Sequence, residues 1–586
     1  MPPKPFSGTL NLIDLNDYLG PSQVCIRPTK SIKPSEETNG SSQNTTIRLD
    51  ESTNSYYESD QNGLNLETKL KKAEISLNDC LACSGCITTS ESILVSLQSA
   101  DEVKKSITEG DLYPIVSVSS HSLASLAAYY NINSLIQTYN LLKKYFTTRL
   151  GFRLVLDLGF AQCLHLYEAR QEFLERWSRA PTSDLVNSSK ADLWKPKPIL
   201  TSSCPGWICY AEKTQGKSGV LESISKVRSA QQIQGSLVKS DRMAKMLGIL
   251  KDKIYHVTVM SCYDKKLEAS RSDFQIDGLK DVDCVLTTRE VQSMMEEDSF
   301  HLSDEASKLN SIWPLVKTDL NEKIGFPIWI DHPEPRGSTT GGYLFNIIRS
   351  VIRQIPVNDQ RRLKLLVDSK RGSDHTEYTL VLEPAIYKTA DLEDTGQVSQ
   401  QVIFHGARFY GFKNLQNLIN RLGLNKINQR VQPGRRRREL SQQQKQQVGF
   451  KNVDRGFDYV EVMACPSGCV NGGGQIPVPQ SQPIVSESNE SSDNLMIRAA
   501  FPAREWIKKV EERYSSTRGR RVARDGDEES SIISYCERDV EQEKEELEIE
   551  DFLQCWNLKT PGRRNRLFRT EYRAIEDEVN GYAVQW

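Results

Sequence analysis

The stretch Glu461-Val-Met-Ala-Cys465-Pro-Ser-Gly-Cys469-Val-Asn-Gly-Gly-Gly-Gln475 decides the fold of this 586-residue chain. It starts inside an apolar, strand-like run, Tyr459–Val462, and continues as a loop with two thiols and three adjacent glycines. Glycines let backbone N–H groups approach a bound group closely. A buried strand that ends in such a loop is typical of an α/β fold, where sites gather beyond the carboxyl ends of the strands.

Other segments repeat this strand-then-loop pattern. The runs Ile115–Val118, Leu154–Leu156 and Ile254–Val259 are predicted to be buried strands, and Leu164–Trp177 is predicted to be a helix. Strands that alternate with helices predict an α/β layer fold with a mainly parallel sheet. Cys262 follows the third of these strands, as Cys465 follows the run at 459–462.

Two more loops bring the number of loop thiols to four. They are Thr201-Ser-Ser-Cys204-Pro-Gly-Trp207 and Met260-Ser-Cys262-Tyr-Asp-Lys265-Lys266. Such thiols and nearby backbone N–H groups are what an iron–sulfur cluster requires. The alternative is that these are ordinary buried cysteines, which are common among free thiols.

The N-terminal part contains a denser group of thiols, Cys80-Leu-Ala-Cys83-Ser-Gly-Cys86. Three thiols at this spacing indicate a 4Fe–4S cluster, which needs a fourth thiolate. Cys25 is the one upstream candidate. A zinc site usually takes its ligands in pairs, and no second pair or nearby histidine accompanies this run. Zinc therefore stays the less favoured alternative.

Composition excludes several classes of protein. Lys and Arg number 75 and Asp and Glu 77, for a net charge of −2, so neither a nucleic-acid sleeve nor direct nucleic-acid binding is expected. No apolar run approaches the length of a membrane span, and the first residues have no apolar signal region. The 13 cysteines are too sparse for a disulfide scaffold, so a reducing compartment is expected.

Polar stretches divide the chain. Residues 31–63 are predicted to be a disordered insertion, 433–447 and 478–494 to be exposed loops, and 516–550 to be charged and mobile. Residues 498–515 and part of 551–586 are predicted to be helical. The expected domains are 1–110 with the N-terminal thiols, 111–477 as an α/β core, 478–497 as a linker, and 498–586 as a small, mostly helical C-terminal region.

The three loops around Cys204, Cys262 and Cys465 closely resemble the signature loops of iron-only hydrogenases. More specifically, the chain resembles the hydrogenase-like family of cytosolic iron–sulfur assembly factors, also called nuclear-prelamin-A-recognition-factor-like. Further segments also resemble the family: Pro21-Ser-Gln-Val-Cys25-Ile-Arg-Pro28, Val116–Leu126, Cys204–Lys213, Val285–Glu290 and Tyr410–Gln416. The resemblance is good from about 64 to 477. It implies an iron-only-hydrogenase-like, two-lobed α/β core after an N-terminal iron–sulfur segment.

The resemblance also implies two 4Fe–4S clusters. The ligands would be Cys25, Cys80, Cys83 and Cys86 for one, and Cys204, Cys262, Cys465 and Cys469 for the other. Hydrogenases have a proton-relaying cysteine where this chain has Ser203, and a proline where it has Ser261; Lys265 is retained. A hydroxyl cannot replace a thiol as a proton relay near neutral pH. The resemblance thus implies an intact cluster pocket without hydrogenase activity.

The implied function is a non-enzymatic part in cytosolic iron–sulfur assembly, with cluster transfer to cytosolic and nuclear apoproteins. The implied partners are scaffold NTPases, a targeting complex with a β-propeller subunit, and apoprotein clients. The expected location is the cytoplasm, with the nucleus as a second candidate. Trp586 is a candidate for docking on the targeting complex, although Gln585 stands where the family has an acidic residue. The alternatives are an oxidoreductase with residual hydrogenase-type activity and a zinc-binding nuclear interaction protein.

Several other features are expected to be structural. The glycine-rich segment Gly337–Tyr343 lacks the phosphate-binding P-loop pattern, so it is predicted to pack against the cluster wall. The basic run Arg435–Arg438 is predicted to be a solvated loop rather than a nuclear-localisation patch. His256 and His405 are expected to be structural histidines. Five thiols match no ligand position and are expected to be buried or incidental: Cys163, Cys209, Cys284, Cys536 and Cys555.

Overall fold

The computed structural model describes the following parts of the chain. In the N-terminal part these are the backbone of 45–50, 55–60 and 68–69; beyond it, they are residues 95, 97–178, 198–216, 218–307, 326–327, 337–355, 363–370, 372–383, 401–422, 456–479, 503–515 and 540–574, with the backbone alone at 540–543. The chain divides into two compact units, Met1–Ser92 and Ile93–Trp586. Within the described ranges, no helix combines the length and the apolar character that a membrane crossing requires.

The first unit contains a small antiparallel sheet. Strand β1 (Thr45–Asp50) pairs with β2 (Ser55–Asp60), which also pairs with β3 (Thr68–Lys69). The prediction that 31–63 is disordered is therefore wrong for β1 and β2. Each strand contains residues that favour strands, such as Ile47 and Tyr57. The polar composition of the whole segment concealed this local pattern.

The second unit contains a four-stranded parallel sheet in the order β10-β7-β4-β5. Its strands are almost wholly buried, as expected for a parallel sheet with helices on both faces. The predicted strands at 115–118, 154–156 and 254–259 are confirmed. The sheet consists of β4 (Tyr113–Val118), β5 (Leu154–Asp157), β7 (Ile254–Met260) and β10 (Cys284–Thr287).

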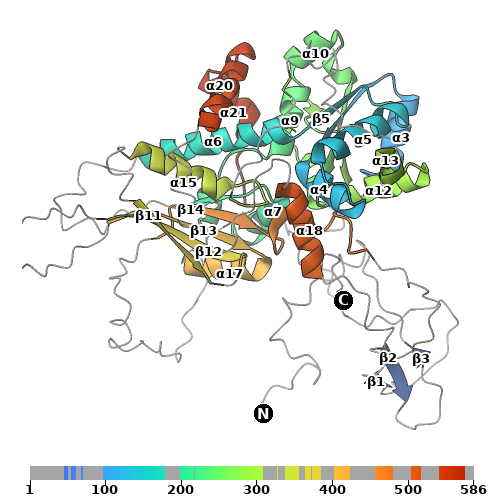
Figure 1. Cartoon of the computed structure of the whole chain (residues 1–586). Helices are drawn as coiled ribbons and strands as arrows, with labels where there is room; N and C mark the ends of the chain where they lie inside the picture. Colours follow the sequence, from blue (N-terminus) through green and yellow to red (C-terminus); the bar gives the residue numbers. More distant parts are fainter. Residues whose placement is uncertain are drawn as a thin grey trace, which may run out of the picture. The chain divides into compact units, whose positions relative to one another are not determined.

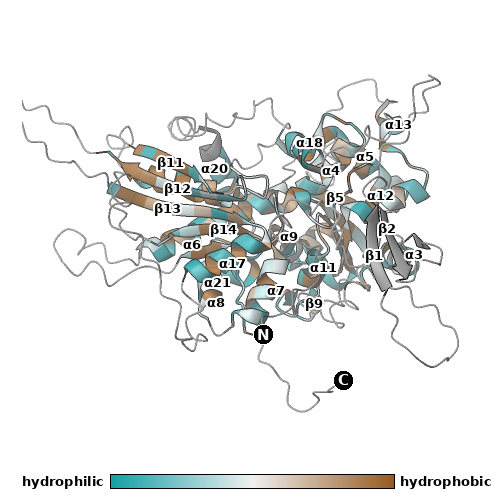
Figure 2. Ribbon diagram, turned by 90° about the horizontal axis from the view of Figure 1, so that it is seen from below, coloured by the Kyte–Doolittle hydropathy of each residue, from teal (hydrophilic) through white to brown (hydrophobic). Residues whose placement is uncertain are grey.

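A five-stranded sheet has the order β11-β12-β13-β14-β6. The pairs β13–β14 and β14–β6 are parallel, whereas β11–β12 and β12–β13 are antiparallel. Figure 1 shows α6 and α15 on one side of this sheet and α17 on the other. Figure 2 shows hydrophobic and hydrophilic segments mixed along strands β11 to β13. The strands are β6 (Ile199–Thr201), β11 (Leu363–Ser369), β12 (His375–Leu382), β13 (Gln401–Tyr410) and β14 (Tyr459–Met463).

Helices and short elements complete this unit. The predicted helix at 164–177 lies inside α6. The elements are α3 (Ala100–Glu109), α4 (Ser120–Tyr129), α5 (Leu135–Thr148), α6 (Gly159–Ser178), α7 (Pro205–Thr214), α8 (Val220–Ser223), α9 (Ala230–Val238), α10 (Asp241–Leu247), η3 (Lys251–Lys253), α11 (Asp264–Ala269), β8 (Gln275–Ile276), β9 (Leu279–Lys280), α12 (Thr288–Glu297), α13 (Leu302–Ser307), α15 (Tyr343–Gln354), α17 (Phe412–Arg421) and η6 (Gly468–Asn471).

The C-terminal region forms α18 (Ala503–Ser515), α20 (Val540–Cys555) and α21 (Pro561–Phe568). Helix α18 packs on α4 and η6, α20 on α6, and α21 on α9. The helix predicted at 498–515 is confirmed over 503–515 as α18, and residues 498–502 lie outside the described residues. The predicted mobility of 516–550 is wrong from Val540 onward, because apolar residues near the end of α20 join the core. Phe552 stacks on Trp556 and packs edge-on against Phe160 of α6.

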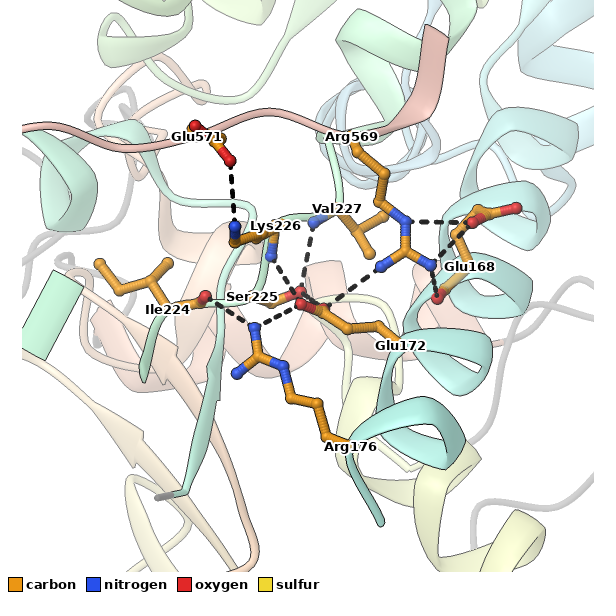
Figure 3. A network of polar contacts seen from close by, with 9 residues as sticks. All are labelled: Glu168, Glu172, Arg176, Ile224, Ser225, Lys226, Val227, Arg569 and Glu571. Atoms are coloured by element: carbon orange, nitrogen blue, oxygen red, sulfur yellow. Dashed lines mark hydrogen bonds and ion pairs between the residues drawn. The ribbon is translucent and has the colours of Figure 1, made fainter. Parts of the chain in front are cut away.

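Buried ion pairs attach the last described stretch to α6 (Figure 3). The carboxylate of Glu168 is fully buried and contacts Arg564 at 2.8 Å and Arg569 at 3.0 Å. One turn further along α6, Glu172 pairs with Arg176 at 2.6 Å and accepts a hydrogen bond from the Ser225 hydroxyl. A charge that is removed from water in this way is stable only with such partners. The C-terminal stretch is thus part of the folded body.

Candidate metal centre

The carboxyl ends of strands from both sheets meet at one cavity of about 70 Å³. Strands β4 and β7 come from the parallel sheet, and β6 and β14 from the mixed sheet. A single water molecule needs roughly 10–15 Å³ by the same measure, so the cavity is several times larger than a water site. This position, in loops beyond strand ends, is the one predicted from the sequence.

Four thiols line this cavity: those of Cys204, Cys262, Cys465 and Cys469. Cys204 follows β6, Cys262 follows β7, and the other two follow β14. Burial raises the pKa of all four thiols, and that of Cys469 rises to about 12. At neutral pH the free thiols therefore keep their protons, and a metal would have to displace them in order to bind thiolates.

Backbone N–H groups point at two of these sulfur atoms. Cys204 accepts hydrogen bonds from the N–H groups of Trp207 and Ala464, and Cys465 accepts one from Gly473; each bond lowers the pKa of its thiol. Cys204 is also the N-cap of α7, whose first residue is Pro205. A helix N-terminus favours negative charge. The local backbone thus favours thiolates at a site where burial opposes them.

Two glycines allow the thiol loop to pack tightly. Gly468 has a φ of +76°, and a Cβ there would lie 2.0 Å from Cγ2 of Thr340. A Cβ at Gly474 would lie 3.1 Å from Cα of Cys262. Thr340 lines the cavity as well. The prediction that the segment at 337–343 packs against the cavity wall is confirmed.

A buried carboxylate joins this segment to the thiol loop. Glu461, on β14, is 1 % exposed, and its two oxygens accept four hydrogen bonds. The donors are the hydroxyls of Ser338 and Thr340 at 2.7 Å, the hydroxyl of Tyr410 at 2.5 Å, and the N–H of Leu344 at 2.9 Å. Because Glu461 lies four residues before Cys465, it fixes the wall beside the thiols.

Two oppositely charged residues line the cavity at the start of α11. The ammonium of Lys265 lies 2.9 Å from Oε2 of Glu268. Asp264 faces α7. A Cβ added at Gly206, in the first turn of that helix, would be 2.6 Å from Oδ2 of Asp264 and 3.8 Å from Sγ of Cys204. The retained lysine is thus part of the cavity wall, and so is a carboxylate.

Ser203 also lines the cavity. Its hydroxyl donates a hydrogen bond to Cys469 and lowers the pKa of that thiol. The four thiols, the N–H donors and this hydroxyl suit a group that fills the cavity and carries negative charge on its sulfur ligands. Among the described residues, no group of three or more His, Cys, Asp or Glu side chains is close enough to hold a single metal ion.

The structure does not place every residue that the sequence singled out. Cys25, Cys80, Cys83, Cys86, Cys536, Trp586 and Arg435–Arg438 lie outside the described residues. Four further thiols lie away from the cavity lining: Cys163 and Cys284 are buried, Cys209 is partly exposed and Cys555 is exposed. His256 is a structural histidine, bonded to Ser117 and to the carbonyl of Asp281. The backbone N–H of His405 donates to the carboxylate of Asp458, and its imidazole Nε2 lies 3.6 Å from Oε2 of Glu377.

Sequence reasoning missed part of the cavity wall. His121 and Gln162 line it, as do Asp264 and Tyr514. The position of Asp264, two residues after a ligand candidate, was a usable signal. Tyr514 comes from α18 and stacks on His121, and no local pattern indicates that contact.

Comparison with known proteins agrees with this architecture. Residues 113–473 match the family described as "Iron only hydrogenase large subunit, C-terminal domain". The chain is 38% identical over 518 residues to the "Cytosolic Fe-S cluster assembly factor NAR1 homolog" of Schizosaccharomyces japonicus, covering 86% of this chain and 89% of the relative. It is 35% identical to "Cytosolic iron-sulfur assembly component 3" of Pongo abelii, over 99% of both chains.

The chain belongs to the hydrogenase-like family of cytosolic iron–sulfur assembly factors. Solved structures show the shared fold: an apo FeFe-hydrogenase from Chlamydomonas reinhardtii has a TM-score of 0.51 at 19% identity, covering 81% of this chain and 98% of the hydrogenase. The iron-only-hydrogenase-like fold class expected from the sequence is thus confirmed. In this member of the assembly-factor family, the cavity lies inside the matched segment, whereas Tyr514 reaches it from beyond that segment.

Proposed function

We propose that this chain acts in cytosolic iron–sulfur cluster assembly and carries two 4Fe–4S clusters. The inner cluster is held by Cys204, Cys262, Cys465 and Cys469, and the outer one by the four N-terminal thiols at 25, 80, 83 and 86. The observation that carries the proposal is the cavity lined by the four inner thiols. The names of the relatives, which describe cytosolic iron–sulfur assembly, support the cellular role.

The residues of the inner site do three things. The thiols bind, the N–H groups of Trp207, Ala464 and Gly473 offset negative charge on sulfur, and the packed wall around Gly468 excludes water. A bound 4Fe–4S cluster supplies one-electron redox chemistry. Because the ligands belong to core loops, binding there also stabilises the fold. We therefore propose that the inner cluster is retained and that a cluster on the N-terminal thiols is the one passed on.

The proposed partners follow from this role. Scaffold NTPases would supply the outer cluster, and a targeting complex with a β-propeller subunit would receive it for apoprotein clients in the cytoplasm and the nucleus. Trp586 is proposed to dock on that complex. The expected domain boundaries at 110, 477 and 497 remain part of the proposal.

A residual hydrogenase-type activity is the second candidate, because the fold is that of the hydrogenases and Lys265 lines the cavity. Ser203 favours the non-enzymatic role, since its hydroxyl holds a proton too tightly to relay it at neutral pH. The two candidates predict opposite results when the anaerobically purified protein is mixed with a reduced dye. Hydrogen evolution would refute the non-enzymatic role.

The test of the two-cluster proposal is the content of iron and acid-labile sulfide, with EPR spectra of the reduced protein. The wild type should hold about eight iron atoms, and Cys25→Ala or Cys465→Ala should each lose about four. Cys163→Ala, which changes a buried thiol away from the cavity, is the matched control and should lose none. Cys465→Ala should also lower solubility more than Cys25→Ala does. About two zinc atoms without sulfide would refute the proposal.

A further inference from the structure

The cavity wall contains one carboxylate among its described residues, that of Asp264, and one lysine, Lys265. The two are neighbours at the start of α11, directly after the loop of Cys262. Asp264 is partly exposed and Lys265 is buried. A charge beside a bound redox group acts on it more strongly the less water there is to screen it. The balance between these two charges therefore matters for anything held by the thiols.

The charge of Lys265 is largely offset. Its side chain is 7 % exposed, and its Nζ lies 2.9 Å from Oε2 of Glu268. The same oxygen of Glu268 accepts hydrogen bonds from Ser229 at 2.9 Å and Gln231 at 3.1 Å, so this carboxylate is well supported. Viewed from the cavity, Lys265 and Glu268 act as a nearly neutral pair.

Asp264 lies on the thiol side of the wall. A Cβ at Gly206 would be 2.6 Å from its Oδ2 and 3.8 Å from Sγ of Cys204. The absence of a side chain at Gly206 is therefore what allows the carboxylate to lie beside the first turn of α7, near the thiol. Any larger residue at this position would displace it.

Three charged residues act on the four thiols: Asp264, Lys265 and Glu461. The charge of Asp264 raises the pKa of the Cys204, Cys262 and Cys465 thiols. The charge of Lys265 lowers the pKa of the Cys469 thiol, and that of Glu461 raises it. Asp264 is thus the cavity-lining carboxylate that acts on three of the four thiols, and it lies beside Cys204.

We propose that Asp264 sets the reduction potential of the cluster held by the inner thiols, by lowering it. The inference rests on the proposed function, because it requires a cluster at this site. Reduction adds one electron from an external donor and therefore one negative charge, and no proton needs to move. The carboxylate makes that added charge less favourable, and Lys265, offset by Glu268, compensates in part. The inner cluster then stays oxidised under conditions that reduce clusters of higher potential.

The test is an EPR-monitored redox titration of the full-length, anaerobically purified protein. Asp264→Asn should raise the ratio of reduced to oxidised inner cluster at least tenfold at a fixed potential, a shift of about 59 mV for one electron. Lys265→Gln should shift the midpoint in the opposite direction. Asp264→Glu keeps the charge and should titrate like the wild type, as should Asp252→Asn, an exposed carboxylate on η3.

The outcomes separate this inference from the proposed function. An Asp264→Asn protein with full iron and sulfide content and an unmoved midpoint overturns the inference and leaves the two-cluster proposal intact. If Asp264→Asn loses the inner cluster, Lys265→Gln decides, and an unmoved midpoint there overturns the inference. A wild type without an inner cluster refutes the proposed function itself.

Discussion

Replacing Gly468 by alanine should destabilise the wall of the thiol cavity, and the loss in free energy of unfolding has two parts, a backbone cost and a packing cost. The φ of +76° costs an alanine about 1–2 kcal/mol, because its Cβ crowds the backbone. The new Cβ would also lie 2.0 Å from Cγ2 of Thr340, and overpacking of this kind costs about 1–3 kcal/mol. The expected loss in the free energy of unfolding is therefore about 2–5 kcal/mol.

A second substitution separates the two costs. Thr340→Ser removes Cγ2 but keeps the hydroxyl that donates to Glu461. The double variant Gly468→Ala/Thr340→Ser should recover the packing cost and keep the backbone cost, which leaves a loss of about 1–2 kcal/mol. Iron content should follow the same order, because the loop between Cys465 and Cys469 is the part displaced.

The assay is the urea midpoint of unfolding, followed by tryptophan fluorescence on anaerobically purified protein. Gly473→Ala is the matched control: a Cβ there meets nothing within 4 Å, and its N–H remains available to Cys465. The reasoning is refuted if Gly468→Ala is as stable as this control. It is also refuted if adding Thr340→Ser to Gly468→Ala recovers none of the lost stability.

Three further predictions concern groups outside the loop. Glu461→Ala leaves three hydroxyls and one N–H without their acceptor. The free energy of unfolding, measured by the same urea midpoint, should fall by about 3 kcal/mol or more. A loss under about 1 kcal/mol would contradict this prediction. Burial lowers the pKa of His165 to about 4 and that of His256 to about 3. Unfolding lets both bind protons near pH 6.5, so stability should fall as the pH drops below that value, by about 2 kcal/mol for each at pH 5; a flat profile would speak against this. Arg569→Ala leaves the buried Glu168 with one arginine partner, Arg564. The free energy of unfolding should fall by about 3 kcal/mol, and the C-terminal stretch should become accessible to protease. Unchanged digestion would count against this prediction.

The fold was predictable where local pattern and burial agree. The β-branched runs in β4 and β7 and the apolar run of β14 form buried strands, because those side chains suit a covered parallel sheet. The antiparallel pairing of β11 to β13 was not predictable, since it depends on which sheet edge a distant segment reaches. The start of α20 was missed because its first half is mostly charged, and the aromatic contacts of Phe552 that hold the helix are long-range.

The residues of the candidate site were also predictable only in part. Cys262 and Cys465 were predictable as neighbours, because each follows a predicted strand and strand ends converge in an α/β fold. Cys204 also follows a strand, β6, but that strand was not predicted. The position of Asp264, two residues after Cys262, was predictable but its role was not, and Tyr514 was not predictable at all. The first becomes important only once Gly206 is seen beside it, and the second arrives from a helix that no local pattern connects to the cavity.

The contribution of Tyr514 has a consequence for how the protein is made. Ribosomes produce the chain from its N-terminus, so all four inner thiols exist before α18 does. At about 5–20 residues per second, the interval between Cys469 and Tyr514 lasts several seconds. During synthesis the nascent chain therefore passes through a period in which the thiol loops are complete and one side of their enclosure has not yet been translated.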